Sequence, residues 1–286
     1  MRIQTPAKIN TLLYILGKRE DGFHDLYMHM VPVNLYDTLT LTKNNKHGLN
    51  FQIKGASFSD SDEDNLVVKA VRAFEQVSRI KVNYDIFLEK KIPYGAGLGG
   101  GSGNAAGTLK VLNYLFRNST QSSGLIPQET LHEIALELGS DIPFFLKPGP
   151  TEIRGRGEKL NNLPDYPKFH VVIIKPSFTI STLEAYQYCI PKREVKFPRI
   201  QSFDDLNSQM NNQFESSLLV QYPVLSKLKT LLLENGAFGA LVTGSGSAVF
   251  GVFNEKNKQK QAYKDLTCLQ IGEIISCETL VNHCYF

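Results

Sequence analysis

The sequence predicts an α+β protein of two domains, residues 1–155 and 156–286, with the boundary in the glycine-rich "KPGPTEIRGRGEK". Three observations predict this class. The first forty residues have strand patterns, an apolar run in "INTLLYILG" and period-two alternation in "YDTLTLTK". A glycine-rich stretch, "KKIPYGAGLGGGSGNAAGTLKVL" at residues 90–112, leads into a helical pattern. Near the end, "GALVTGSGSAVFGVF" has the pattern of a strand, a small-residue turn and a second strand.

Composition and charge indicate which kinds of binding partner the protein is expected to have. Of the 286 residues, 42% are hydrophobic and 21% are charged, which suits a globular protein with a sizeable core. The net charge is +3 and there is no Lys/Arg-rich block, so no nucleic-acid partner is predicted. The start "MRIQTPAKIN" lacks the apolar region of a signal peptide, and runs such as "VVII" are too short to cross a bilayer. We therefore expect a cytoplasmic protein with no membrane partner. The cysteines form no C-x-x-C pair and are expected to be reduced thiols: Cys189, Cys268, Cys277 and Cys284.

The acidic segment "SDSDEDNLVVKAVRAFEQV" predicts a loop followed by a helix that Asp64 or Asn65 caps. Asp60, Asp62 and Asp64 alternate as the ligands of a calcium loop do. An EF-hand would then need glycine and glutamate at the positions of Asn65 and Val71, so calcium is not predicted. The apolar face of the helix consists of Leu66, Val67, Ala70, Val71 and Phe74.

A strand in "VNYDIFLEKKIP" is predicted to lead into the glycines, and two helices are predicted to follow them. One face of the first helix is formed by Ala105, Leu109, Leu112 and Phe116. The second helix begins near Pro127 and ends near Gly139. Its apolar positions are Leu131, Ile134, Ala135 and Leu138. The phrase "SDIPFFL" follows, in which residue types alone indicate that Asp141 belongs to a helix cap.

The second half predicts alternating strands and helices. "KFHVVIIKP" is typical of a buried strand, and "STLEAYQYC" of a helix. Residues 191–205 are rich in Pro, Lys and Arg and predict a loop. A helix follows in "PVLSKLKTLLLENG", ended by Gly236, and the hairpin pattern comes after it.

The glycine-rich stretch admits three interpretations. It contains G-x-G-x-x-G at Gly95, Gly97 and Gly100, but no acidic residue lies between Glu89 and Glu129 to bind a dinucleotide ribose. It ends in Gly-Ser-Gly-Asn rather than Gly-Lys-Ser/Thr, which excludes a Walker A loop, and no protein-kinase motif set occurs. A phosphate-binding nest of backbone N–H groups before a helix remains, beside a packed glycine turn without a ligand.

Three segments together resemble the signatures of the GHMP small-molecule kinases, in that family's order and spacing. They are "TPAKINTLLYILGKREDGFHDL", "PYGAGLGGGSGNAAGTL" and "LVTGSGSAVFG". The resemblance implies an N-terminal domain like ribosomal protein S5 domain 2 and a C-terminal ferredoxin-like α/β sandwich. It also implies phosphorylation of a small-molecule hydroxyl by ATP with Mg²⁺. "REDGFHDL" and "GSDIPFFL" are similar to one branch of the family, whose substrate is a polyol linked to cytidine diphosphate.

The resemblance implies that Asp141 takes the proton from the substrate hydroxyl and that Lys8 pairs with Asp141 and offsets charge on the transferred group. From residue types alone, Lys8 would be a surface lysine at a strand edge. The implied ATP-binding residues are Asn65, Pro93, Gly95, Gly97, Leu98, Gly99, Gly100, Gly101, Ser102 and Gly103. Asn65 would lie near the adenine or cap a helix, and Ser102 would add a hydroxyl to a phosphate or to magnesium. Gly103 departs from the family, which usually has serine there.

For the substrate, the resemblance implies a nucleobase pocket formed by Phe23 and His24, with Tyr186 as the opposing ring. Asn10 would face the polyol hydroxyls. The turn Gly244, Ser245 and Gly246 would close over the phosphates or support the glycine loop. Ordinary core packing and a plain hairpin turn are the alternatives for these residues, and no side chain is assigned to a metal.

Two rival functions stay open at the level of the sequence. One is another kinase of the same superfamily, of the mevalonate, homoserine or galactose type, and the other is a catalytically silent binding protein with this fold. "DGFHDL" with Tyr186 favours the cytidylated substrate over the first rival, and intact Lys8 and Asp141 argue against the second. The expected partner is a small molecule, and the expected state is a monomer or a weak homodimer.

Overall fold

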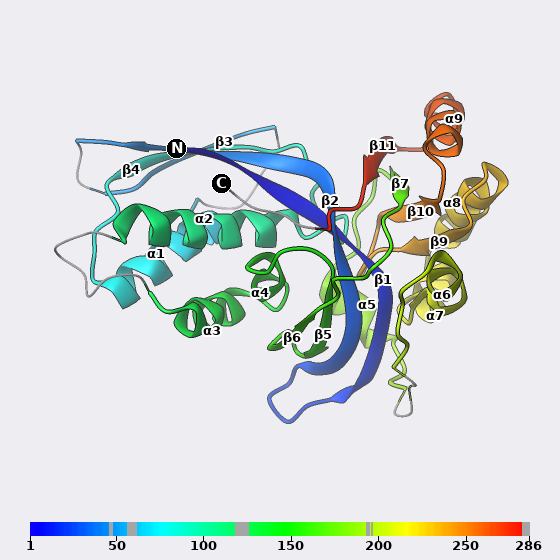
Figure 1. The fold of residues 1–286 in the computed structure, drawn as a ribbon, viewed down its shortest axis with the longest axis horizontal. Coiled ribbons are helices and arrows are strands. Elements are labelled where there is room, and N and C mark those ends of the chain that lie inside the picture. The colour runs from blue at the N-terminus through cyan, green and yellow to red at the C-terminus, as the bar shows by residue number, and fades with distance from the viewer. Residues whose placement is uncertain (46–47, 56–61, 118–125, 193–194, 196, 282–286) are drawn as a thin grey trace.

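The computed structural model of the chain describes residues 1–45, 48–55, 62–117, 126–192, 195 and 197–281. Two sheets organise these residues (Figure 1). The larger, seven-stranded sheet has the order β3-β4-β2-β1-β8, with β5 paired to β2 and β6 paired to β5. The smaller sheet has four strands in the order β11-β7-β10-β9. The structure is therefore α+β, as the sequence predicts.

The strands of the larger sheet are β1 (Arg2–Lys18), β2 (His24–Lys43), β3 (Asn50–Lys54), β4 (Tyr84–Glu89), β5 (Thr151–Gly155), β6 (Lys159–Asn162) and β8 (Asn211–Asn212). Those of the smaller sheet are β7 (His170–Lys175), β9 (Gly239–Val242), β10 (Val249–Phe253) and β11 (Glu273–Glu278). The helices beside the larger sheet are α1 (Leu66–Ser78), α2 (Gly100–Phe116), α3 (Gln128–Leu138) and α4 (Ile142–Phe145). Those of the second half are α5 (Thr182–Gln187), α6 (Phe203–Gln209), α7 (Glu215–Gln221), α8 (Pro223–Glu234) and α9 (Lys256–Thr267).

The predicted strands of the first forty residues are confirmed as one long antiparallel pair, β1 and β2. Their apolar side chains are buried along most of the length, in part because α2 packs on this strand pair. The strand β5 pairs with β2 along Leu26–Met30. The register shifts at three places, between Pro6 and Ala7, between Asn10 and Leu12, and between Ile15 and Gly17. Such bulges bend a strand pair and re-aim its side chains. In Figure 1 this pair runs from the helices of the first half toward the smaller sheet.

The helices predicted in the first half are confirmed, with small shifts at their ends. Asn65 caps α1, because its Oδ1 accepts a hydrogen bond from the backbone N–H of Val67 at 2.9 Å. Pro127 directly precedes α3 and Gly139 directly follows it. The helix after the glycines begins at Gly100, so part of the glycine-rich stretch is already the first turn of α2.

In the second half, the predicted hairpin is confirmed as β9 and β10, paired from Val242 with Val249 onward. The predicted loop 191–205 is too long by a few residues, because α6 begins at Phe203, where Ser202 and Asp205 form a capping box. The division near residue 155 stays a prediction. It falls at the end of β5, whose partner β6 belongs to the same larger sheet.

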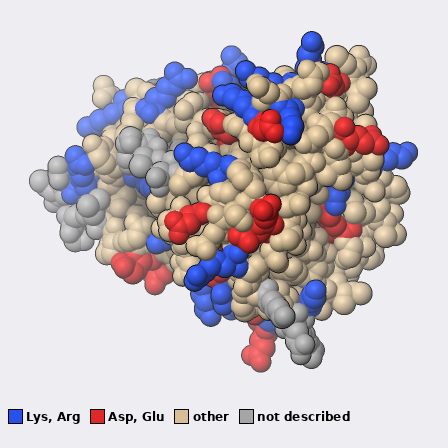
Figure 2. All heavy atoms as spheres, turned by 45° about the vertical axis from the view of Figure 1, so that its right-hand side comes forward, with Lys and Arg blue, Asp and Glu red and all other residues tan. Residues whose placement is uncertain are grey.

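On the face shown in Figure 2, basic and acidic side chains are interspersed. The described part of the chain contains no helix long and apolar enough to span a membrane. The three described cysteines, Cys189, Cys268 and Cys277, are not joined in disulfides. Cys284 and Asp60 lie outside the described residues.

Candidate active site

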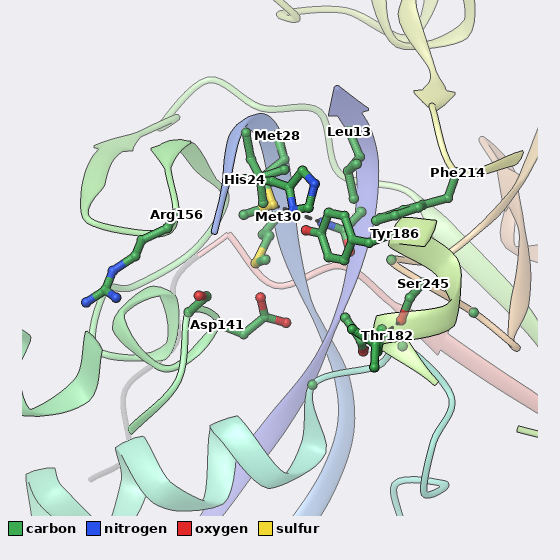
Figure 3. Close-up of a pocket in the computed structure, with 18 of the residues that line it drawn as sticks. Leu13, His24, Met28, Met30, Asp141, Arg156, Thr182, Tyr186, Phe214 and Ser245 are labelled. Atoms are coloured by element: carbon green, nitrogen blue, oxygen red, sulfur yellow. Dashed lines mark hydrogen bonds between the residues drawn. The ribbon is translucent and has the colours of Figure 1, made fainter. Parts of the chain in front are cut away.

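Two cavities meet at the glycine-rich loop. The larger cavity has a volume of about 550 Å³ and extends from Lys8 and Asp141 to His24 and Tyr186 (Figure 3). The smaller cavity has a volume of about 280 Å³ and lies along the loop itself and the start of α2. Both are lined by the same three glycines, Gly95, Gly97 and Gly99. A ligand in one cavity can therefore approach a ligand in the other at these glycines.

Lys8 and Asp141 form an ion pair in the larger cavity. The Lys8 Nζ lies 3.4 Å from Asp141 Oδ2 and donates a hydrogen bond of 2.6 Å to Asn10 Oδ1. The Lys8 side chain is only 3% exposed, whereas that of Asp141 is 33% exposed. The interpretation of Lys8 as a surface lysine is therefore wrong. A buried ammonium group needs paired acceptors, and Asp141 and Asn10 supply them.

The positions of this pair follow from local structure. Lys8 lies on β1, and its backbone N–H donates to the carbonyl of Leu98 at 2.9 Å, which ties the strand to the glycine loop. Asp141 stands at the N-terminus of the short helix α4, after the chain has left α3 at Gly139. Its side chain makes no capping hydrogen bond there. The carboxylate is consequently directed to Lys8 and the cavity rather than to its own helix.

Nearly all of the residues implied to bind ATP line the smaller cavity. They are Asn65, Pro93, Gly95, Gly97, Leu98, Gly99, Gly100, Gly101 and Ser102. The start of α2 offers backbone N–H groups and the positive end of the helix dipole, which favour binding of an anion. This arrangement fits the predicted phosphate nest.

Gly103 is the exception among the implied ATP-binding residues, because it does not line the smaller cavity. It is buried where α2 crosses β1, and a Cβ atom there would lie 2.9 Å from the carbonyl oxygen of Pro6. A backbone oxygen at that distance leaves no room for a side chain unless the helix moves. Glycine at position 103 therefore permits the close contact between α2 and the Pro6 carbonyl of β1.

A buried polar cluster below the loop was not predicted from the sequence. Asp37 is fully buried and accepts hydrogen bonds from the backbone N–H groups of Lys91 and Ile92 at 2.7 and 2.8 Å. It also accepts bonds from the Lys90 ammonium group and from the Asn104 amide. Asp37 thus fixes both the entry to the glycine loop and the first turns of α2. The sequence signal was a lone aspartate in an alternating strand before "TLTLTK".

The far end of the larger cavity is aromatic. The rings of His24 and Tyr186 stack with centroids 4.2 Å apart and planes inclined by 13° (Figure 3). Phe214 packs edge-on against Tyr186, with centroids 4.9 Å apart. Tyr186 was predicted to lie opposite His24, and the two rings are in direct contact. Burial, and to a smaller degree the charge of Lys18, lowers the pKa of His24, so its ring is neutral at pH 7.

Burial also raises the pKa of Tyr186, and the negative charge of Asp141 adds to this shift, so Tyr186 keeps its phenolic proton. The neutral His24 and Tyr186 rings offer a stacking surface without a net charge, which suits a nucleobase.

The turn 244–246 comes from the smaller sheet and lines the larger cavity. Asn212 holds it, donating hydrogen bonds of 2.7 and 2.8 Å to the carbonyls of Val242 and Gly244. Thr243 connects it to the first half, because its Oγ1 accepts from the Asn10 N–H at 3.2 Å and donates to the Gly97 carbonyl at 3.4 Å. Thr243 therefore connects this turn to β1 and to the glycine loop.

Several residues that line the larger cavity were not predicted, and most of them, such as Arg156 and Thr182, lie outside the three signatures. Arg156 reaches the rim from the turn between β5 and β6, and Thr182 contacts the Ser245 hydroxyl at 3.2 Å. The apolar wall includes Leu13, Leu26, Met28, Met30, Ile180 and Phe214. The described residues contain no group of three His, Cys, Asp or Glu side chains that could hold a metal ion by themselves.

Comparison with known protein families agrees with this geometry. The family model described as GHMP kinases N terminal domain matches residues 65–149, which include the glycine loop and Asp141. The model described as GHMP kinases C terminal matches residues 194–270, which include the turn 244–246. The fold and these matches define the class as a two-domain small-molecule kinase.

Curated relatives make the assignment more specific. A protein from Chlorobium phaeobacteroides is 40% identical over 266 residues, with 90% of each chain covered. One from Syntrophus aciditrophicus is 39% identical over 267 residues, covering 92% of this chain and 93% of the relative. Both are named 4-diphosphocytidyl-2-C-methyl-D-erythritol kinase. The chain therefore belongs to the GHMP kinases and, within them, to the 4-diphosphocytidyl-2-C-methyl-D-erythritol kinase family.

Solved structures give the same result for the fold. A crystal structure of 4-(cytidine 5'-diphospho)-2C-methyl-D-erythritol kinase matches with a TM-score of 0.82 at 28% identity, covering 98% of this chain and 99% of the other. A mevalonate kinase matches with a TM-score of 0.70 at 14% identity, covering 98% and 99%. The second likeness shows the shared fold alone.

Proposed function

We propose that this chain transfers the γ-phosphoryl group of ATP to a hydroxyl of 4-diphosphocytidyl-2-C-methyl-D-erythritol, in the non-mevalonate pathway to isoprenoid precursors. The observation that carries the proposal is the Lys8–Asp141 pair, 3.4 Å apart, in the larger cavity beside the glycines that both cavities share. A phosphoryl donor in the smaller cavity and an acceptor hydroxyl in the larger one would meet beside this pair.

The transfer requires a base and a compensating positive charge. The Asp141 carboxylate accepts the proton of the substrate hydroxyl as the oxygen forms its bond to the γ-phosphorus and the bond to ADP breaks. The Lys8 ammonium group stabilises the negative charge that develops on the hydroxyl oxygen and on the transferred group. Asn10, hydrogen-bonded to Lys8, holds that ammonium in place and faces the polyol.

The smaller cavity supports the nucleotide assignment. The N–H groups at the start of α2 would bind the triphosphate, and Asn65 would lie beside the adenine. Asn65 also caps α1, but that bond uses its Oδ1, so its amide nitrogen is the group that would contact the base. Asn65 can therefore cap α1 and contact the adenine at the same time.

Magnesium fits the same region by the chemistry of its donors. Mg²⁺ prefers oxygen ligands and is commonly held by substrate phosphates with few protein groups. The hydroxyl of Ser102, in the first turn of α2, is the protein oxygen that would hold it. When bound, the ion neutralises negative charge on the triphosphate.

The stacked rings of His24 and Tyr186 support the cytidine end of the substrate. This aromatic end distinguishes the proposal from a mevalonate-, homoserine- or galactose-type kinase, whose substrates carry no nucleobase. We further propose a cytoplasmic monomer or weak homodimer that acts on small molecules and binds neither nucleic acid nor membrane. Light scattering of the protein as it elutes from a size-exclusion column, at several concentrations, would test the proposed oligomeric state.

The deciding experiment is a coupled assay of ADP release with the full chain, ATP and magnesium. Release should require 4-diphosphocytidyl-2-C-methyl-D-erythritol and should not occur with mevalonate, homoserine or galactose. Release with one of those three instead would establish the rival kinase. ATP binding without release in the presence of any of the four substrates would establish a catalytically silent protein.

A further inference from the structure

Arg156, on the turn between β5 and β6, has no role in the chemistry described above. We propose that Arg156 binds the diphosphate of the substrate, and that it selects substrates whose nucleobase and acceptor hydroxyl are joined by a diphosphate. This inference rests on the proposed function. It assigns a specificity-determining contact to a residue that lies outside the three signature segments.

Arg156 contacts the aromatic end of the larger cavity, where the nucleobase would bind. The Arg156 guanidinium lies over the ring of Phe23, 4.7 Å from its centroid, in cation–π geometry. Phe23 precedes His24, whose ring stacks on Tyr186. The contact with Phe23 therefore places the arginine beside the surface on which the nucleobase would stack.

The turn that carries Arg156 also packs against the end of the cavity where the acceptor hydroxyl would bind. Gly157, next to Arg156, has a φ of +130°, and a Cβ atom on it would lie 2.2 Å from the carbonyl oxygen of Ser140. Only a glycine allows the turn to approach the chain so closely at that point. Because Ser140 directly precedes Asp141, the turn that carries Arg156 is packed against the segment that carries the proposed base. The turn that carries Arg156 thus contacts both ends of the cavity, the Ser140–Asp141 segment through Gly157 and Phe23 through the guanidinium.

The turn is also held in a fixed position. The backbone N–H of Arg156 donates to Glu158 Oε2 at 2.6 Å, and Glu158 Oε1 lies 3.1 Å from Arg19 Nη1. Arg19 in turn binds Asp21, which accepts a hydrogen bond from the backbone of Phe23. These bonds connect the tip between β1 and β2 to the turn between β5 and β6. The cation and the aromatic end are therefore positioned together.

Lys8 and Arg156 are the only lysine or arginine side chains among the described residues that line the larger cavity. Lys8 is already paired with Asp141 and Asn10, and burial keeps His24 neutral. Arg156 takes part in none of the ion pairs between described residues. In Figure 3 Arg156 lies on the side opposite Thr182 and Ser245, and its guanidinium extends outward from Asp141 and His24.

A planar guanidinium suits this task, because it can donate two parallel hydrogen bonds to phosphate oxygens. The diphosphate must run from the nucleobase at His24 to the hydroxyl at Asp141. Of the two described lysine and arginine side chains that line the larger cavity, Arg156 is the one that makes no ion pair, although its charge also acts on Asp21.

The test compares inhibition by cytidine and by cytidine diphosphate in the parent and in Arg156→Gln, with the ADP-release assay as readout. In the parent, the diphosphate should compete better than the nucleoside. Arg156→Gln should reduce that advantage by about tenfold to a hundredfold, the range for a charge-assisted hydrogen bond, while inhibition by cytidine stays the same. Arg156→Lys should retain part of the advantage, because it keeps the charge but loses the planar fork.

Lys159→Gln is the matched control, since Lys159 is an exposed cation on β6 that lines neither cavity. It should leave the ratio of the two inhibition constants unchanged. An unchanged ratio in Arg156→Gln, with turnover of the cytidylated substrate by the parent, overturns this inference alone. No turnover of that substrate by the parent overturns the proposed function instead. An equal loss of cytidine and cytidine diphosphate inhibition in Arg156→Gln would show that Arg156 only supports the fold, and would also overturn the inference.

Discussion

The two cavities are built in different ways. The smaller cavity is lined mainly by one continuous segment, Pro93–Ser102, and much of what it offers a ligand is backbone. The larger cavity is lined by side chains from separate segments, among them Asn10 on β1, Tyr186 on α5 and Ser245 in the β9–β10 turn. Triphosphate recognition by backbone N–H groups can reside in one stretch of sequence. Recognition of a particular substrate depends on side chains that only the tertiary structure brings together.

The comparison predicts that variants should separate into two groups. Changes in the larger cavity should affect the cytidylated substrate without affecting ATP, and changes near the glycine loop should do the reverse. Asp141 lies where the two ligands would react, so its replacement should affect neither binding step and should instead slow the chemical step.

The largest effect is expected for Asp141→Asn, which keeps the shape of the side chain but removes the base. Turnover should fall by about a hundredfold to ten-thousandfold, the contribution typical of general acid–base catalysis, while the KM for ATP stays unchanged. Steady-state kinetics of ADP release measures both quantities. Asp165→Asn, at an exposed position that lines neither cavity, is the control and should behave as the parent. Near-normal turnover in Asp141→Asn would exclude Asp141 as the base.

A smaller effect is expected for Tyr186→Ala, which removes the ring stacked on His24. Loss of a base-stacking ring costs about 1–3 kcal/mol, so the KM for the cytidylated substrate should rise roughly tenfold to a hundredfold. The KM for ATP should not change. Tyr186→Phe should retain the parent value, because the ring rather than the hydroxyl provides the surface. Tyr188→Ala, two residues on and 56% exposed, is the matched control. A parallel rise in both KM values would contradict the separation of the two sites.

The elements that could be predicted from the sequence are those with a signal in one continuous segment, like the residues of the smaller cavity. The strands β1, β2 and β4, the helices α1, α2 and α3 and the hairpin β9–β10 were predicted, because each has a local period or a glycine or cap at its end. The short strands β3, β5, β6 and β8 were not predicted, since their two to five residues are too few to establish a period. β9 and β10 are as short and could be identified only as a hairpin, from the small-residue turn between them.

At the site, the residues of the glycine loop could be identified from one segment. The Lys8–Asp141 pair could be assigned only through the family resemblance, because from residue types Lys8 indicates a surface position although it is 3% exposed. Arg156 and Asp37 carried no signal of their role, since their partners Phe23 and Lys90 are distant in sequence. Long-range contacts of this kind are fixed by the pairing of β2 with β5 and with β4.

The smallest effect is expected on the side of the smaller cavity, for Gly103→Ser, which restores the residue usual in the family. The new Cβ atom would lie 2.9 Å from the Pro6 carbonyl and 3.4 Å from the Phe145 ring. Overpacking of this kind costs about 1–3 kcal/mol of unfolding free energy, which urea denaturation measures. The KM for ATP should not fall, because position 103 does not line the smaller cavity.

Gly101→Ala is the matched control for Gly103→Ser, because it lies in the same helix and a Cβ atom there would meet only Leu66, at 3.5 Å. It should stabilise the protein by about 0.4–1 kcal/mol, since alanine restricts the unfolded chain. Undiminished stability of Gly103→Ser together with a lower KM for ATP would contradict the packing argument. It would mean that α2 can shift away from β1 and that a second hydroxyl can reach the triphosphate. Recognition in the smaller cavity would then depend on side chains as well, and the contrast between the two cavities would weaken.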